Sequence, residues 1–295
     1  MPEGPEIRLE ADRIAKVLAG QRIEQAQCAL PALTRRVARL AGRRVDAVET
    51  RGKAMLIHLD HGHTLYSHNQ LYGRWFVQKR GELPNTGRSL RLALHTAAGS
   101  ALLYSASTIE LLKTAELGKH PFLSRLGPDA LSAEFDWRAL AARLDLPAFR
   151  RRSLAALYLD QGFLAGIGNY LRSEILFFAG VPPDARPMDL DDRTRATLAR
   201  VSLAVTRRAY EARGVTNPHQ RVQALKAAGA KRGGYRFAVF AREGQACHDC
   251  GTTIVRTEAN ARRLYWCPSC QRARGERRPA RIIGGGGRRR ARNAG

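Results

Sequence analysis

Four of the five cysteines stand in two pairs near the C-terminus, Cys247-His-Asp-Cys250 and Cys267-Pro-Ser-Cys270, with sixteen residues between the pairs. A pair at this spacing holds a metal from one tight turn, and two pairs complete the tetrahedral site of a structural zinc. Four thiolates leave no coordination position for a reactive water, so such a metal stabilises the fold and takes no part in chemistry. The sequence therefore predicts one structural Zn²⁺ on a short β-ribbon, bound by Cys247, Cys250, Cys267 and Cys270.

The chain carries a large excess of positive charge. Fifty Lys and Arg residues stand against 26 Asp and Glu, which gives a formal net charge of +24. A bias toward arginine can exchange Lys for Arg, but it does not create a twofold excess of positive over negative charge. We therefore expect a polyanionic partner, with nucleic acid favoured over a membrane surface or an acidic protein.

Residues 272–295 contain nine of the arginines and a run of four glycines. We expect this segment to be a disordered basic tail that adds salt-sensitive affinity for DNA. The alternative is a solvated tail without a dedicated role.

The rest of the composition indicates the compartment. No apolar run reaches the 18 to 20 residues, roughly, of a membrane-spanning helix, and no basic segment followed by an apolar one opens the chain. Paired cysteines and a lone Cys28, which we assign to packing, fit a metal site in a reducing compartment. We expect a cytoplasmic protein without a membrane partner; that it is bacterial, nucleoid-associated and monomeric is an expectation that depends on the family resemblance given below.

The opening Met1-Pro2-Glu3-Gly4-Pro5-Glu6 holds a candidate nucleophile. If the initiator methionine is removed, the secondary amine of Pro2 is free, and an α-amino group titrates near a pKa of ~8. Such an amine forms a Schiff base with an aldehyde carbon, and Glu3 and Glu6 are candidate acid, base or orienting groups. The alternative is a stiff or frayed terminus. This stretch alone does not decide between them.

Hydrophobic periodicity predicts an α+β protein of several domains. Residues 7–19 have helical spacing, and the region from residue 22 to about 106 has short segments typical of a β-sandwich or barrel. The segments are 44–49, 54–59, 73–77, 90–94 and 101–104. Beyond a turn-rich stretch at 117–128, helical patterns cover 135–146, 153–161, 170–178 and 188–212, and a polar, basic loop is expected at 213–234. We predict domains at 1–130, 131–245 and 246–271, followed by the tail.

Two connectors in the β region carry candidate residues. Lys53 follows a glycine at a turn, where it either reaches a phosphate or sugar or is simply solvated. The segment 67–73 places Gln70, Leu71 and Tyr72 side by side. These three residues, called the triplet below, either protrude and fill the hole left when a base leaves a duplex, or belong to a hairpin with Leu71 in the core.

Two further candidates lie in the C-terminal half. Asn169 follows a glycine-rich turn and stands where a helix N-cap is expected. Loop amides and an Asn side chain at such a turn are a recurrent grip on DNA phosphates. Arg262 lies between the cysteine pairs and is expected at the tip of the ribbon. There its guanidinium either contacts DNA, in a groove or at a phosphate, or is solvated.

Together these motifs resemble the formamidopyrimidine-DNA glycosylase/endonuclease VIII family over residues 1 to about 271. The resemblance rests on the opening six residues, Arg51-Gly-Lys53, Gly166-Ile-Gly-Asn169 and the paired cysteines with Gln271. The stretches 66–73, 103–107 and 168–172 are most similar to the endonuclease VIII branch. The implied fold is an N-terminal helix with a β-sandwich, a helix-two-turns-helix domain and a four-cysteine zinc-finger β-ribbon.

The resemblance implies a bifunctional DNA glycosylase and AP lyase that excises oxidised bases, chiefly pyrimidines, from damaged double-stranded DNA and cuts the strand by β,δ-elimination. It assigns the nucleophile to Pro2, acid and base catalysis to Glu3, and assistance in base loss to Lys53. Phosphate contacts fall to His68, Asn169 and Arg262, void filling to Gln70, Leu71 and Tyr72, and a supporting acidic role to Glu174.

Three alternatives remain open on the sequence. The first is a preference for 8-oxoguanine and formamidopyrimidine lesions within the same fold. The second is a damaged-DNA-binding zinc protein without catalysis, against which the intact Pro2, Glu3 and Lys53 argue. The third is an RNA-binding zinc-ribbon protein.

Overall fold

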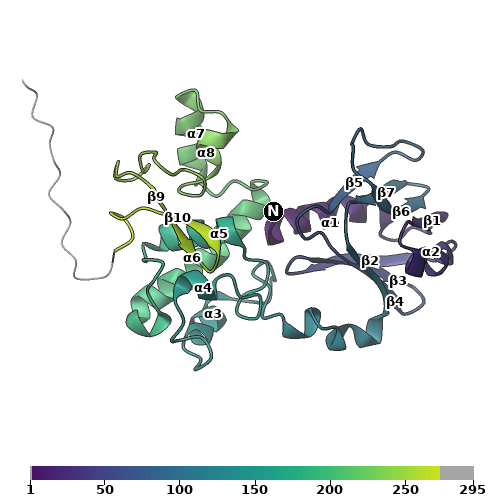
Figure 1. Ribbon diagram of the computed structural model, residues 1–295, viewed down its shortest axis with the longest axis horizontal. Coiled ribbons are helices and arrows are strands. Elements are labelled where there is room, and N and C mark those ends of the chain that lie inside the picture. Colours follow the sequence, from purple (N-terminus) through teal and green to yellow (C-terminus); the bar gives the residue numbers. More distant parts are fainter. Residues whose placement is uncertain (1, 273–295) are drawn as a thin grey trace, which may run out of the picture.

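The computed structural model describes residues 2–272, and Figure 1 shows them as two bodies joined near the start of the chain. Met1 and residues 273–295, which are all but the first residue of the predicted basic tail, lie outside the described residues. The N-terminal body is built mainly of strands and the C-terminal body mainly of helices (Figure 1). No helix in the described range is long and apolar enough to cross a membrane.

Two antiparallel four-stranded sheets make up most of the N-terminal body, in the orders β1-β6-β7-β5 and β2-β3-β4-β8. Their strands are β1 (Gln25–Cys28), β2 (Val45–Arg51), β3 (Ala54–Leu59), β4 (His63–His68), β5 (Arg74–Gln78), β6 (Leu90–Thr96), β7 (Gly99–Tyr104) and β8 (Thr108–Lys113). The helices α1 (Gly4–Leu18) and α2 (Pro31–Ala38) pack with them. The predicted sandwich with an N-terminal helix is therefore confirmed.

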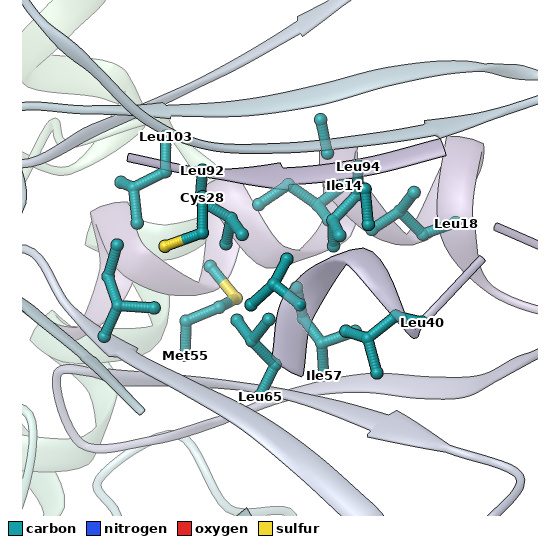
Figure 2. Close-up of a cluster of buried hydrophobic side chains, with 14 of the residues drawn as sticks. Ile14, Leu18, Cys28, Leu40, Met55, Ile57, Leu65, Leu92, Leu94 and Leu103 are labelled. Carbon is teal, nitrogen blue, oxygen red and sulfur yellow. The ribbon is translucent and has the colours of Figure 1, made fainter. Parts of the chain in front are cut away.

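One hydrophobic core joins α1, α2 and both sheets. Figure 2 shows Ile14 and Leu18 of α1 among leucines of the two sheets, with the sulfur atoms of Cys28 and Met55 inside the cluster. Cys28 is 5% exposed and sits in this apolar packing, as expected for it. The core holds α1 firmly, and α1 carries the candidate catalytic residues at its N-terminal end.

The periodicity missed two features of this body. Helix α2 lies inside the region predicted as strands, because Leu33 and Val37, four residues apart, bury one face of a short helix that begins at Pro31. Helix α1 begins at Gly4 and not at residue 7, since Pro5 fits the first turn and the Glu6 carboxylate accepts the backbone N–H of Glu3 at 3.1 Å.

The C-terminal body packs helices around a second core. Its helices are α3 (Trp137–Leu144), α4 (Leu154–Leu157), α5 (Asn169–Ala179), α6 (Asp192–Glu211), α7 (His219–Ala227) and α8 (Arg232–Arg236), with a short 3-10 helix at Pro187–Asp189. Two other 3-10 helices, Thr114–Lys119 and Leu123–Arg125, pack on the strands of the N-terminal body through Leu117 and Leu123. Helix α5, buried along most of its length, runs through the centre and packs against α6.

Two local predictions in this body were wrong. Asn169 is the first residue of α5, and its N-cap is Gly168. The cap role is filled by a carboxylate from another element, described below. The predicted loop 213–234 contains α7 and the first three residues of α8, and both helices protrude from the body in Figure 1. No residue of either helix is buried, which explains why no apolar periodicity marked them.

The zinc-finger ribbon consists of β9 (Val255–Ala259) and β10 (Arg262–Trp266), paired antiparallel. Asn260 and Ala261 form its tip in the left-handed conformation, with φ of 56° and 54°. Leu264 belongs to the helical core, so the ribbon is packed onto the C-terminal body.

Candidate functional site

Helix α5 lies close to the start of α1 at the junction of the two bodies (Figure 1), and hydrogen bonds from the start of α5 to Glu3 join the two N-terminal ends. The Glu3 side chain, only 3% exposed, accepts backbone N–H groups from Gly168 at 2.7 Å, Tyr170 at 2.8 Å and Leu171 at 3.2 Å. These donors are the free amides of a helix start, which favour an anion. The Glu3 carboxylate therefore takes the place of an Asn169 cap and bonds the two bodies together.

Burial raises the pKa of Glu3 to about 7, and the charge of Lys53 and the amide of Tyr170 limit the rise. A carboxyl group that titrates near neutral pH can both donate and accept a proton under physiological conditions. Glu3 thus has the protonation behaviour of a general acid and base.

Glycines allow this close approach. The backbone N–H of Gly4 donates to the carbonyl of Gly166 at 2.8 Å, and Gly166 has a φ of +93°. A Cβ atom on Gly168 would lie 2.4 Å from Cδ of Glu3. The glycines of this turn therefore leave the space that the Glu3 side chain occupies.

Lys53 lies across the same turn. Its Nζ donates to the carbonyl of Ile167 at 2.6 Å. Burial lowers the pKa of Lys53, the nearby Glu3 charge opposes that change, and Arg262 reinforces it. A lysine in this setting is partly stripped of water and close to the candidate acid and base, so it is not the simple solvated turn residue that the sequence left open.

Asp129 supports the Lys53 turn and was missed by sequence reasoning. Its carboxylate accepts the N–H of Gly52 at 2.6 Å and that of Leu131 at 2.8 Å, and burial raises its pKa. The Gly127-Pro128 sequence predicted a turn, but nothing in it indicated that the following residue, Asp129, contacts the β-sandwich.

Pro2 is half-buried and lines a groove of about 650 Å³ that runs along α1. Leu71 and Tyr72 of the triplet also line it. The other lining side chains include five cations, Arg13, Lys16, Arg74, Arg88 and Arg213, and three carboxylates, Glu6, Glu10 and Asp12. Glu6 also contacts the C-terminal body. Its carboxylate accepts the Tyr170 hydroxyl at 3.0 Å and the Arg236 guanidinium at 3.3 Å. Glu6 is thus an orienting group between α1 and the C-terminal body.

The triplet protrudes from the loop between β4 and β5. Leu71 is 60% exposed and Tyr72 is 70% exposed, so the hairpin alternative with Leu71 in the core is wrong. The Gln70 side chain donates to the Thr108 hydroxyl and accepts from the Ser107 hydroxyl, both at 2.9 Å. An apolar and an aromatic side chain held in solvent at the edge of a cationic groove can enter a nucleic acid.

His68 lies at the base of the triplet. Its Nδ1 accepts the backbone N–H of Gln70 at 3.3 Å, and its ring contacts Phe122 edge-on at 5.1 Å between centroids. Burial and the charge of Lys53 lower its pKa. This imidazole is therefore held neutral between the triplet and Lys53.

Asn169 lies at the start of α5, where this helix contacts β10 of the ribbon. The Asn169 amide donates to the carbonyl of Arg263 and accepts from Arg172, both at 2.7 Å. Its two ends therefore bind protein groups here, and the phosphate contact that the resemblance implies stays a prediction. Arg262 is exposed at the start of β10, immediately after the ribbon tip.

Arg172 was also missed by the sequence analysis. It is fully buried, and it donates to the carbonyl of Ala155 at 2.9 Å and to that of Ala259 at 3.3 Å. It therefore joins α5 to the ribbon. The only signal in the sequence was a charged residue on an otherwise apolar helix face, which indicates a paired buried group.

Glu174 lies farther along α5, 0% exposed. Its carboxylate accepts backbone N–H groups from Ala238, Val239 and Phe240, each at 2.8 Å, and the hydroxyl of Thr216. All these partners follow α6 in the chain. Glu174 therefore fastens the segment that leads into the zinc finger, and it does not face the groove.

The four paired cysteines fit a zinc ion. Their Sγ atoms all lie within 4.8 Å of one another, with 3.9 Å between Cys247 and Cys270 and 3.5 Å between Cys250 and Cys267. A tetrahedral zinc with Zn–S bonds of ~2.3 Å places sulfur atoms about 3.8 Å apart. One structural Zn²⁺ held by these four residues would fix the ribbon against α5.

Comparisons with known proteins agree with this geometry. Three family models match: the formamidopyrimidine-DNA glycosylase N-terminal domain at residues 1–107, its H2TH domain at 126–220, and a zinc finger found in FPG and IleRS at 244–273. The chain is 44% identical to proteins named endonuclease 8 from Pectobacterium atrosepticum and Salmonella enteritidis, over 92% of its length and 100% of theirs.

Solved structures share the fold. A Lactococcus lactis formamidopyrimidine-DNA glycosylase bound non-covalently to DNA with an AP site superposes with a TM-score of 0.73, at 19% identity, over 91% of this chain and 99% of that one. A complex of the L. lactis enzyme with DNA containing an oxidised pyrimidine gives 0.74 at 20% identity, over 92% and 99%.

Proposed function

The chain belongs to the formamidopyrimidine-DNA glycosylase/endonuclease VIII family, and from this membership we propose how its site works. It is a DNA glycosylase and AP lyase of base excision repair, and DNA is its partner. We propose that it acts on oxidised pyrimidines in duplex DNA and leaves a one-nucleotide gap by β,δ-elimination. We also propose that it works as a monomer in the cytoplasm, on the nucleoid.

The nucleophile in this proposal is the amine of Pro2 after removal of Met1. The Pro2 nitrogen bonds to C1′ of the damaged nucleotide while the bond from C1′ to the base breaks, and the bonding electrons leave with the base. The nitrogen loses its proton, the sugar ring opens, and an iminium forms. A chain that keeps Met1 has Pro2 as a tertiary amide, which is not a nucleophile.

Glu3 is the general acid and base of the proposal. It protonates the sugar ring oxygen during ring opening and afterwards accepts the protons removed in the two eliminations. One observation carries this assignment: a carboxyl group with a pKa of about 7, beside Lys53 and directly after Pro2 in the chain. Lys53 contacts the nucleotide and assists departure of the base.

The remaining side chains place the DNA. Leu71 and Tyr72 enter the duplex where the damaged nucleotide leaves the stack, and Gln70 faces the opposite base. His68, Asn169 and Arg262 approach phosphates around the site, with Asn169 exchanging its protein partners for a phosphate when DNA binds. The cationic groove along α1 adds attraction that depends on salt.

Borohydride trapping tests the nucleophile. Mature protein, with loss of Met1 verified by mass spectrometry, is incubated with a duplex containing an abasic site, and we expect a covalent complex after reduction. A Pro2→Gly variant retains a terminal amine and should still be trapped, whereas a variant with an alanine inserted before Pro2 moves the amine away and should be trapped poorly. Absence of a crosslink with the mature protein, under conditions that trap a known lyase, would refute the mechanism.

Parallel cleavage of duplexes containing thymine glycol or 8-oxoguanine tests the substrate class. We expect faster excision of thymine glycol. The opposite order would replace the pyrimidine preference with the purine alternative while leaving the lyase mechanism intact.

A further inference from the structure

Glu10 lies two turns after Glu3 on α1 and contacts the loop that bears the triplet. Its Oε2 accepts a hydrogen bond from Nδ2 of Asn69 at 2.8 Å. Asn69 is 4% exposed, and its Oδ1 has no hydrogen-bond partner within residues 2–272. The bond to Glu10 is therefore the one side-chain hydrogen bond of this buried amide on the described part of the chain, and it satisfies the NH2 end.

Asn69 directly precedes the triplet and forms one end of the loop that carries it. The backbone N–H of Gly73 donates to the carbonyl of Asn69 at 2.7 Å and closes the loop around the three side chains. A Cβ atom on Gly73 would lie 2.7 Å from Cα of Asn69, so the two ends of the loop touch. A shift of Asn69 would consequently move the whole triplet.

Three other hydrogen bonds hold the loop. The Arg88 guanidinium donates to the carbonyl of Tyr72 at 2.6 Å, and the Gln70 side chain is held by Ser107 and Thr108. These contacts come from the β5–β6 connection and from the start of β8. The contact from Glu10 differs from them because it comes from α1, which directly follows the candidate nucleophile Pro2 and the candidate acid Glu3.

We propose that Glu10 is a positioning residue that sets the void-filling triplet in register with the nucleophile, through its hydrogen bond to Asn69. This inference rests on the proposed function, in which the triplet enters the duplex while Pro2 attacks C1′. The triplet and the Pro2 amine must be in place at the same time, and α1 is the rigid element that contacts the triplet loop and follows Pro2 directly. The expected consequence is an effect on damaged duplexes and none on substrates with no void to fill.

The test compares two substrates for four proteins. The proteins are the wild type, Glu10→Ala, Glu10→Gln and Leu71→Ala, and the substrates are a duplex with an oxidised pyrimidine and a single-stranded oligonucleotide with an abasic site. We expect Glu10→Ala to lower kcat/KM on the duplex about tenfold and to leave single-strand cleavage within about twofold. Glu10→Gln keeps an acceptor oxygen for Asn69 and should restore duplex activity to within about threefold of wild type.

A double variant identifies the path of the effect. In a Leu71→Ala background, Glu10→Ala should cause no further loss on the duplex, because the triplet that it positions is already disabled. Glu116→Ala is the matched control, since Glu116 is exposed and pairs only with Lys113 at 3.6 Å among the described ion pairs. It should leave both activities unchanged.

Several outcomes would overturn the inference. Equal losses on both substrates, losses that multiply in the double variant, or a Glu10→Gln variant as poor as Glu10→Ala would each show that Glu10 acts otherwise. Should Glu10→Ala fold poorly by circular dichroism, Asn69→Ala provides the same test from the other side of the bond. A wild type that cleaves neither substrate would instead refute the proposed function itself.

Discussion

Glu3 and Glu174 are two carboxylates held in the same way at two places in the molecule. Each is buried, and each accepts three backbone N–H groups from a segment distant in the sequence. Glu3 joins α1 to the start of α5, and Glu174 joins α5 to residues 238–240. On burial and backbone hydrogen bonding alone, the two would be indistinguishable.

Their neighbours separate them. Glu3 adjoins Lys53 and follows Pro2, which lines the groove, whereas the fourth donor to Glu174 is the hydroxyl of Thr216 inside the protein. A ring of amides fixes a carboxylate in position. Proton transfer also needs a reactive partner and access for substrate, so only Glu3 has the surroundings of a catalytic group.

The largest expected difference between the two is in catalysis. Glu3→Gln should lower single-turnover base excision about 1000-fold, because the amide neither donates nor accepts the protons of ring opening and elimination. Glu174→Gln, assayed at equal concentrations of folded protein, should stay within about fivefold of wild type. Comparable losses in the two variants would show that fixing α5 matters more than proton transfer at Glu3.

Glu174 should matter for the stability of the fold, although it should matter little for catalysis. Glu174→Ala leaves three amides and a hydroxyl without their acceptor, and at about 1 kcal/mol each it should lower the free energy of unfolding by about 4 kcal/mol. Urea denaturation followed by tryptophan fluorescence measures this. Thr216→Val removes one donor and should cost about 1 kcal/mol; a loss in Glu174→Ala no larger than that would contradict the anchoring role.

The sequence was a good guide where the information is local. The cysteine spacing indicated the zinc ribbon, and the short apolar run at residues 54–59 predicted β3 with its observed bounds. The opening motif, together with the family resemblance, singled out Pro2 and Glu3. In each case neighbouring residues determine the outcome.

Contacts across long separations escaped prediction. Glu3 and Gly168 stand 165 positions apart, and nothing in either segment shows that the Glu3 carboxylate caps α5 in place of the Asn169 amide. Arg172 and Asp129 were missed for the same reason, because their partners come from other elements. Helices α7 and α8 escaped because helices without a buried face leave no apolar period.

A third prediction concerns the pH dependence of stability. The pKa of Glu3 is raised from 4.5 to about 7 on folding, so the folded state binds the proton more tightly than the unfolded state. Stability contributed by the protonated form is therefore present below about pH 4.5 and is lost as the pH rises toward 7, by about 3 kcal/mol. Urea denaturation measures the free energy of unfolding of wild type and Glu3→Gln from pH 4.5 to 8. The value for wild type minus that for the variant should decrease as the pH rises toward 7. A difference independent of pH would mean that Glu3 titrates normally.

The smallest effect is expected from the glycine that admits Glu3. In Gly168→Ala the new methyl group would lie 2.4 Å from Cδ of Glu3, so the carboxylate must move away from the start of α5. The acid and base would remain present but displaced, and we expect base excision to fall about tenfold. Gly118→Ala is the matched control, because a Cβ atom there meets nothing within 4 Å. Normal excision by Gly168→Ala would show that Glu3 works without its three amide donors, and the resemblance between the Glu3 and Glu174 sites would then have no bearing on catalysis.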